Sequence, residues 1–259
     1  MLNHKTYKII LAILAIFSFT LPVSAMFIFF DDSDLGTTST PTFSPADISG
    51  LTAWWKADSL ALSNNDPVST WTDSSGNGHD GTASLTTRPT YIASWNNSKP
   101  ALYFDGSNDY MTITSSFYDS DWTQFVVFEK DTGSNFPTMT TDSAASLGYG
   151  VFPSSGTTYV SDRSYYTYVN SQDGSGKHYW SLKVTSAHAF SLWKDGTSLT
   201  LQSPTLVTNT TSNFTDIGRR AVDSAYANGW MAEMLMYNSA LSDTDRGNVE
   251  TYLKNKYGL

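Results

Sequence analysis

Oxygen-bearing side chains gather in two glycine-containing stretches of the sequence. They are Asp73, Asn77 and Asp80 in the first stretch, and Asp105, Asn108 and Asp109 in the second. Because Ca²⁺ takes about six to eight oxygen ligands, the two stretches together predict a calcium site. No EF-hand loop is present, so such a site would be assembled from separate loops. The alternative is that these residues only shape turns, because Asp and Asn side chains accept hydrogen bonds from nearby backbone amides.

A second group of residues suits sugar binding. In residues 165–170, the alternation of a strand puts Tyr166, Tyr168 and Asn170 on one face. Tyrosine rings stack on the apolar faces of pyranose rings, and an amide can grip sugar hydroxyls. We therefore predict a ligand-binding platform on this face, the alternative being that core or loops cover both faces. The tryptophans expected in the core rather than against a ligand are Trp54, Trp55, Trp71 and Trp230.

The sequence offers no motif for nucleophilic catalysis or for a transition-metal site. The chain has no cysteine, which excludes thiol nucleophiles, disulfides and Cys-ligated zinc. The histidines lack the spacing of a zinc or iron site; they are His4, His79, His178 and His188. No Gly-x-Ser-x-Gly motif is evident, so a serine hydrolase is not predicted either.

The overall composition fits one exported globular domain. The 259 residues are 40% hydrophobic and 14% aromatic, which is enough apolar material for a core without disulfides. Asp and Glu number 24 against 15 Lys and Arg, for a net charge of -9. Such an acidic chain is expected to have no nucleic acid as a partner, because phosphates would be repelled.

The first thirty residues resemble a targeting segment. Lys5 and Lys8 precede an apolar run over residues 9–21, and Val23-Ser24-Ala25 offers a signal-peptidase site. The apolar run also continues to Phe30, which is long enough to span a membrane if it is not cleaved. Residues 1–30 are thus expected to be a signal peptide or a membrane anchor. Residues 31–46 are predicted to form a Ser/Thr/Pro-rich linker and residues 47–259 to form the domain. We expect this domain to be secreted or held at a cell or virion surface.

The exported part reads as all-β with one helix at its end. Short runs of β-branched and aromatic residues predict strands at residues 52–57, 68–72, 101–104, 110–114, 124–129, 165–170, 178–184, 190–193 and 230–237. Asp195-Gly196 predicts a tight hairpin, because both residues tolerate a positive φ. A capping box at Ser242 and Asp245 predicts the start of a packing helix that Gly258 ends.

Four segments of the sequence resemble the laminin G-like branch of the concanavalin A-like lectin/glucanase superfamily. They are residues 51–58 (LTAWWKAD), 71–81 (WTDSSGNGHDG), 100–110 (PALYFDGSNDY) and the closing stretch from 229–233 (GWMAE) through 241–243 (LSD) and Arg246. The resemblance implies a two-sheet antiparallel jelly-roll sandwich, and it agrees with the strand pattern. Members of this family often hold calcium at the edge of the sandwich. The fold hosts lectins, adhesion modules, trimming enzymes and virion proteins, so it does not fix the function.

The glutamates argue against a glycan-cleaving enzyme. Glycoside hydrolysis needs a pair of carboxyl groups, and glucanases of this superfamily carry them in a Glu-x-Asp-x-x-Glu signature. This chain has only Glu129, Glu233 and Glu250, and the residues after Glu233 supply no second or third acid. We therefore expect a non-catalytic recognition or adhesion module that binds glycan or another surface ligand. The alternatives are a structural or virion-associated subunit anchored by the N-terminal helix and, behind it, a glycan-cleaving enzyme.

Overall fold

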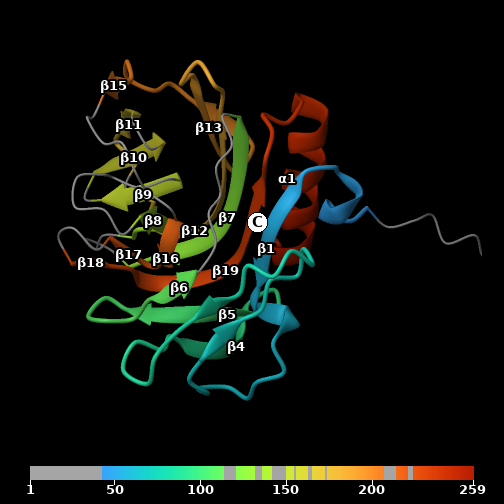
Figure 1. Cartoon of the computed structure of the whole chain (residues 1–259), viewed down its shortest axis with the longest axis vertical. Coiled ribbons are helices and arrows are strands. Elements are labelled where there is room, and N and C mark those ends of the chain that lie inside the picture. The colour runs from blue at the N-terminus through green and yellow to red at the C-terminus, as the bar shows by residue number, and fades with distance from the viewer. Residues whose placement is uncertain are drawn as a thin grey trace, which may run out of the picture. The chain divides into compact units, whose positions relative to one another are not determined.

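The largest sheet has eight antiparallel strands in the order β14-β13-β12-β7-β19-β5-β4, with β1 added to β19 (Figure 1). Its strands are β1 (Leu51–Lys56), β4 (Thr90–Asn96), β5 (Lys99–Asp105), β7 (Trp122–Lys130), β12 (Gly176–Val184), β13 (Phe190–Lys194), β14 (Thr197–Leu199) and β19 (Asn228–Tyr237). Two strands share one edge of β19. The first half of β19 pairs with β5 through Trp230 and Tyr103, and the second half pairs with β1 through Glu233 and Lys56.

The structure is a computed structural model that describes residues 43–113, 121–131, 136–141, 150–154, 156–162, 165–172, 174–206, 214–220 and 224–259. These residues belong to one unit, Phe43–Leu259. The expected signal peptide or anchor at residues 1–30, and the linker up to residue 42, lie outside them. Within the described part of the chain, no helix is long and apolar enough to cross a membrane.

Shorter strands form a second layer. A five-stranded sheet has the order β2-β3-β6-β16-β8, and a four-stranded sheet has the order β15-β11-β10-β9. The strands are β2 (Thr70–Trp71), β3 (Gly81–Thr82), β6 (Met111–Ile113), β8 (Met139–Thr141), β9 (Gly150–Ser154), β10 (Thr157–Asp162), β11 (Tyr165–Asn170), β15 (Thr205–Leu206) and β16 (Phe214–Ile217). A two-stranded ribbon is made by β17 (Arg219–Arg220) and β18 (Ala225–Tyr226). Short 3-10 helices cover Pro45–Asp47 and Ala57–Ser59.

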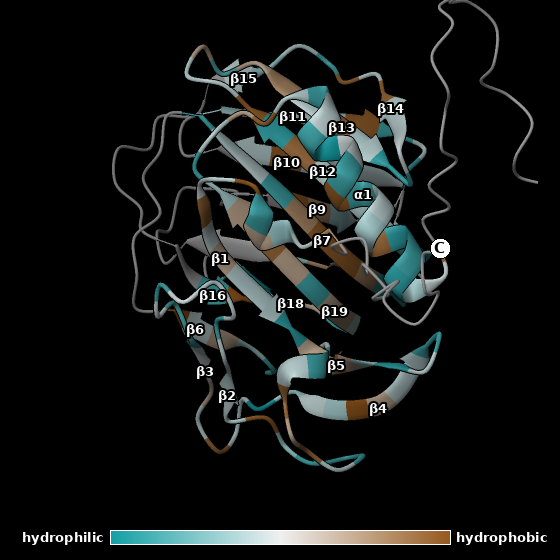
Figure 2. Cartoon of the chain, turned by 90° about the vertical axis from the view of Figure 1, so that its right-hand side faces the viewer, coloured by the Kyte–Doolittle hydropathy of each residue, from teal (hydrophilic) through white to brown (hydrophobic). Residues whose placement is uncertain are grey.

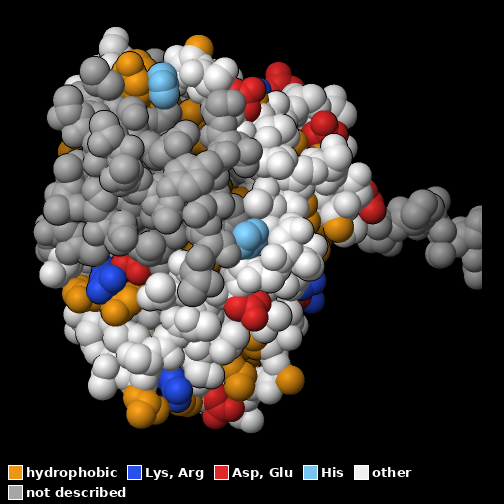
Figure 3. All heavy atoms as spheres, viewed as in Figure 1, with side chains coloured by type: hydrophobic (Ala, Val, Ile, Leu, Met, Phe, Trp, Pro, Cys, Tyr) orange, Lys and Arg blue, Asp and Glu red, His pale blue; other side chains and the backbone are white. Residues whose placement is uncertain are grey.

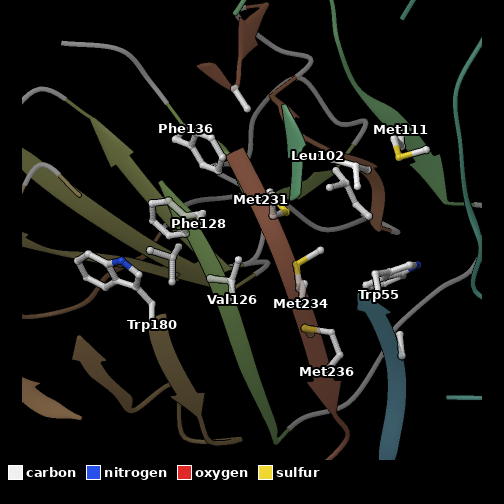
Figure 4. Close-up of a cluster of buried hydrophobic side chains, with 14 of the residues drawn as sticks. Trp55, Leu102, Met111, Val126, Phe128, Phe136, Trp180, Met231, Met234 and Met236 are labelled. Atoms are coloured by element: carbon white, nitrogen blue, oxygen red, sulfur yellow. The ribbon is translucent and has the colours of Figure 1, made fainter. Parts of the chain in front are cut away.

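The main core lies between the two layers (Figure 4). Val126 and Phe128 of β7 and Met234 of β19 supply the large sheet's side of this core, and all three are fully buried. Met111 of β6 and Val160 of β10 meet them from the second layer. Because the two layers bury one shared apolar interior, the domain is an antiparallel β-sandwich, which confirms the predicted fold class.

A second core lies between the opposite face of the large sheet and helix α1 (Asp243–Tyr257). Val249 and Leu253 of α1 cluster with Phe125 of β7 and Leu235 of β19. The central strands are therefore buried on both faces, which explains why β7 contains the unbroken apolar run FVVF at residues 125–128 rather than an alternation of apolar and polar residues. Figure 2 shows α1, with many hydrophilic positions, lying across that sheet.

The ends of α1 follow the sequence prediction. The Ser242 hydroxyl accepts a hydrogen bond of 3.1 Å from the Asp245 amide, which satisfies one of the free amides of the first turn. The Asp245 carboxylate accepts from the Ser242 hydroxyl rather than from its amide, so the predicted capping box is half formed. Gly258 ends the helix at φ 67°, a left-handed conformation that suits glycine.

The strands predicted from the sequence are all present, and the Asp195-Gly196 hairpin has φ values of 50° and 76°. Three longer strands were not predicted: β4, β9 and β10. In β4 the register shifts between Ile92 and Asn96, so its buried and exposed positions do not alternate.

On the face shown in Figure 3, hydrophobic side chains of the described residues lie in small groups among polar ones.

Candidate functional site

The predicted tyrosine platform lies on β11, in the four-stranded sheet. Thr167 and Val169 point into the sandwich, where Thr167 is fully buried. Tyr166 and Tyr168 are half-buried on the opposite side of the strand, and Asn170 is exposed. The alternation inferred from the sequence is therefore present, with the core on one side and the tyrosines on the other.

The register of the sheet adds two rings that the sequence prediction missed. Tyr159 of β10 lies directly opposite Tyr168 and, on its other side, opposite Phe152 of β9. The ring centroids of Tyr159 are 5.7 Å from Tyr168 and 6.4 Å from both Tyr166 and Phe152. Phe152 is only 5% exposed, so it supports Tyr159 and offers no stacking surface of its own. We call the set Phe152, Tyr159, Tyr166, Tyr168 and Asn170 the tyrosine face.

The tyrosine face ends at a positive charge and at an amide. The guanidinium of Arg220 lies 4.6 Å from the centre of the Phe152 ring, within the range of cation–π attraction. At the other end, the Asn170 amide oxygen accepts a hydrogen bond of 3.5 Å from the Thr157 hydroxyl. Tilted aromatic rings beside hydroxyl and amide groups offer both stacking surface and hydrogen bonds, which is what a sugar ring requires.

The first predicted calcium loop is held by the carboxylate of Asp73. Its Oδ1 accepts from the amides of Trp54 and Ser75, both at 2.9 Å. Its Oδ2 accepts from the Ser75 hydroxyl at 2.8 Å and from the His79 amide at 3.0 Å. These hydrogen bonds lower the pKa of Asp73 although burial acts in the opposite direction. Asp80 accepts from the Asp73 amide at 2.7 Å. The carboxylate thus has a turn-forming role.

The remaining residue of that loop, Asn77, donates through its amide to the carbonyls of Leu51 and Thr52 at 3.0 and 2.9 Å. The loop is thereby attached to β1. These two bonds come from the side-chain nitrogen of Asn77 and orient its amide group against β1.

The second predicted calcium loop follows β5. Asp105 Oδ1 accepts from the amides of Ser107 and Asn108 at 2.8 and 3.2 Å, and the Asn108 amide donates to the carbonyl of Thr86. Asp109 is 7% exposed and accepts from the Asp105 amide at 3.1 Å. Burial, together with the neighbouring charge of Asp105, raises the pKa of Asp109 to about 6.

The two loops have different neighbours. Asp73 and Asn77 bond β1, whereas Asp105 and Asn108 bond residues of their own loop and Thr86. Among the residues that the structure describes, no group of three or more His, Asp or Glu side chains is arranged to hold a metal ion. The calcium site stays a prediction.

The three glutamates are each engaged in the fold. Glu233 is fully buried and accepts from Trp54 and Lys256, at 2.5 and 2.7 Å. Glu250 accepts from Arg246 at 2.6 Å and from Ser181 at 2.7 Å. Both therefore join α1 to the large sheet.

Glu129 lies at the end of β7, where the indole N–H of Trp95 donates to it at 2.7 Å. It is half-buried, and the ammonium of Lys177 is 4.0 Å away.

The described histidines serve separate local contacts. The His79 carbonyl accepts from the Trp55 indole at 2.8 Å, and the ring of His188 stacks on Tyr165 at 4.1 Å. The two ring nitrogens of His178 face the Asp195 carboxylate at 2.6 Å and the Ser175 carbonyl at 2.9 Å. These contacts belong to three different parts of the sandwich.

No family model matches the sequence, and no curated protein matches it. Solved structures do match in fold. The sialidase of Trypanosoma rangeli in complex with sialic acid aligns with a TM-score of 0.52 at 14% identity, over 80% of this chain and 33% of the sialidase. The binding domain of Paraclostridial Mosquitocidal Protein 1 aligns with a TM-score of 0.54 at 12% identity, over 82% of this chain and 54% of that one.

A third similar structure is the receptor-binding domain of botulinum neurotoxin C/D mosaic serotype. Its TM-score is 0.53 at 10% identity, and the alignment covers 80% of this chain and 52% of that domain. This chain therefore spans between a third and about half of the structures that it matches. At such identities the likeness shows a shared fold and carries no residue of a site across.

Proposed function

We propose that this chain is a non-catalytic, exported recognition module of the laminin G-like type that binds glycan at a cell surface through the tyrosine face. The observation that carries the proposal is the direct opposition of Tyr159 and Tyr168, whose rings are 5.7 Å apart on the side of the sheet away from the core. Thr167 and Val169 anchor the same strand in the interior. The rings are thus presented by a rigid element, which limits the entropy lost on binding.

Three of the structural likenesses support a role in binding. One similar structure is a sialidase in complex with sialic acid, and two others are the binding domains of toxins. Because this chain spans only part of each, the proposal takes from them the general idea of ligand recognition on a β-sandwich and no enzymatic activity.

The engagement of the glutamates supports the non-catalytic part of the proposal. A glycosidase acid must be free to give its proton to the leaving oxygen, and its partner carboxylate must reach the sugar from the other side. Glu233 of β19 and Glu250 of α1 are buried between the helix and the large sheet, where protein donors bond their carboxylates. Neither carboxylate is then placed to meet a polysaccharide.

A glycan array with the full chain tests the proposal. We expect binding to a subset of glycans, and the double substitution Tyr166→Ala/Tyr168→Ala to weaken it about tenfold, equal to roughly 1.4 kcal/mol. Tyr166→Phe/Tyr168→Phe keeps the rings and should retain most of the affinity if stacking dominates. Trp193→Ala, which removes a half-buried ring beside α1, is the matched control and should bind like the wild type.

Two results would contradict the proposal. One is the absence of binding to any glycan by the folded wild-type chain, which would favour a structural or virion-associated subunit. The other is release of reducing sugar from a polysaccharide panel that is lost on substitution of an acid, which would restore the catalytic alternative.

A further inference from the structure

One end of the large sheet presents an aromatic pair on the same side as α1. Tyr103 of β5 lies opposite Trp230 of β19, and Trp230 lies opposite Glu129 of β7. Glu129 in turn lies opposite Lys177 of β12. Four neighbouring strands thus set these side chains in one row. All four are half-buried. Trp230 is among them, although its sequence context predicted a core position.

A second row lies two residues further along the same strands. Asp105 follows Tyr103 on β5 and pairs with Asn228, and the Asn228 carbonyl accepts from the amide of Asp131 at 3.0 Å. Because alternate residues of a strand share a face, Asp105 lies on the same side as the rings. Asp131 directly follows the end of β7, two positions after Glu129, and the same alternation extended by one residue places it on that side too. We call the set Tyr103, Asp105, Glu129, Asp131 and Trp230 the ring–carboxylate patch.

The two rings of the patch leave their polar atoms free for a ligand. Their centroids are 4.9 Å apart and their planes are inclined by 45°. Among the described residues, none accepts a hydrogen bond from the Tyr103 hydroxyl or from the Trp230 indole N–H. Burial, followed by the charges of Asp131, Asp105 and Asp109, raises the pKa of Tyr103.

The charge around the rings is negative. Lys177 partly balances Glu129 at 4.0 Å, but its ammonium also donates to the Trp95 carbonyl at 3.0 Å. Asp105 and Asp131 form no ion pair with a described residue. An anionic sugar would be repelled by these two carboxylates, whereas a cation is attracted both by them and by the faces of the rings.

We propose that the ring–carboxylate patch binds an organic cation, a ligand that carries a quaternary ammonium group. The methyl groups of the ligand pack on Tyr103 and Trp230, and Asp131 and Glu129 balance its charge. The occupant is chosen by charge complementarity, because a neutral apolar group would gain nothing from the carboxylates. This site is on a different sheet from the tyrosine face, and it stands whether or not that face binds glycan.

The test is a calorimetric titration of the full chain with choline in buffer containing EDTA, which keeps divalent cations from competing. We expect saturable binding with a Kd of about 1 mM or below, and binding at least about tenfold weaker for the uncharged isostere of choline, in which carbon replaces nitrogen. Asp131→Asn preserves size and should weaken choline binding about fivefold without changing the response to the isostere.

Substitution of the rings separates a built site from general charge attraction. Trp230→Ala should abolish choline binding, and Tyr103→Phe should keep it because the ring remains. Trp193→Ala, which removes a half-buried ring from β13 of the same sheet, should leave it unchanged. Equal affinity for choline and its uncharged isostere overturns the proposal, as does the absence of saturation in the folded wild-type chain. Since Trp230→Ala also reduces packing, choline binding that survives both Asp131→Asn and Tyr103→Ala counts equally against it.

Discussion

The ammonium of Lys256 on α1 donates a hydrogen bond of 2.7 Å to the fully buried carboxylate of Glu233 on β19. The same carboxylate accepts from the Trp54 indole, from the Tyr252 hydroxyl at 3.1 Å and from the Tyr257 hydroxyl at 2.8 Å. Burial and the charge of Glu233 raise the pKa of both tyrosines, so they stay protonated as donors. The carboxylate of Glu233 therefore connects three side chains of α1 to the sandwich.

Removing the cation should leave the charge of Glu233 buried without a counterion. We expect Lys256→Met to lower the free energy of unfolding by about 3 kcal/mol, because an unpaired buried charge is costly. The double variant Glu233→Gln/Lys256→Met should recover part of that loss, since it removes the charge with its partner. Urea denaturation of the two single variants and the double variant measures the coupling.

Lys254→Met is the matched control for this experiment, because Lys254 is exposed on the same helix. Its effect should stay within about 0.5 kcal/mol. If Lys256→Met were equally neutral, the hydrogen bond between Lys256 and Glu233 would contribute nothing to holding α1.

The core and the helix could be predicted from local sequence, but the sites depend on register. The run at residues 124–129 predicts a buried strand from its composition, and β7 covers it, while Ser242 and Gly258 mark the helix ends. Tyr166, Tyr168 and Asn170 were assigned correctly to one face because alternation is a local property.

The partners of those residues lie on neighbouring strands, and no local sequence pattern tells which strands pair. Tyr159 joins the tyrosine face only through the pairing of β10 with β11, and Tyr103 meets Trp230 only through the pairing of β5 with β19. The aspartates could be found from the sequence, but their role could not. An Asp in a glycine-containing loop suits both calcium binding and turn formation. In the structure, Asp73 and Asp105 accept hydrogen bonds from backbone amides within their own loops.

Gly229 should tolerate no side chain. Its φ is 141°, and a Cβ atom there would lie 2.1 Å from the carbonyl oxygen of Glu129 on the neighbouring strand. Because that contact is with backbone, relief requires β19 to move away from β7. We expect Gly229→Ala to cost about 3 kcal/mol or more in the free energy of unfolding, measured by urea denaturation.

Gly247→Ala offers the matched comparison. Gly247 lies within α1, and a Cβ atom there would meet nothing within 4 Å. Alanine is favoured over glycine inside a helix by about 1 kcal/mol, so this variant should be more stable than the wild type. Equal effects of the two substitutions would mean that the contact at Gly229 does not constrain β19.

Asp109 should make stability depend on pH. Its pKa is raised from 3.8 to about 6, first by burial and then by Asp105. The folded chain thus binds this proton more tightly than the unfolded chain. The stabilising effect is full below about pH 3.8, decreases as the pH rises and is lost above about 6. Asp109→Asn should therefore raise the free energy of unfolding at pH 7 by up to about 3 kcal/mol.

The slope of stability against pH is the measurement, taken from urea denaturation between pH 4 and 7, about the range of the two pKa values. Asp109→Asn should flatten the slope. Asp105→Asn removes the neighbouring charge, so the slope should become smaller. The slope should not disappear, because Asp109 is still buried. A wild-type slope that survives Asp109→Asn would assign the titration to another group.

Calcium should reverse the unfavourable effect of Asp109 ionisation if the second loop holds the ion. Bound Ca²⁺ would stabilise the ionised carboxylates, and a ligand at about a hundred times its Kd adds roughly 2.7 kcal/mol to the free energy of unfolding. Thermal unfolding at pH 7 should then give a higher Tm in Ca²⁺ than in EDTA, and Asp105→Asn should remove the difference.

Asp73→Asn should lower Tm in both buffers, because that carboxylate accepts hydrogen bonds from backbone amides in the turn. A wild-type Tm that is the same in Ca²⁺ and EDTA would leave all six loop residues with the turn-forming role alone.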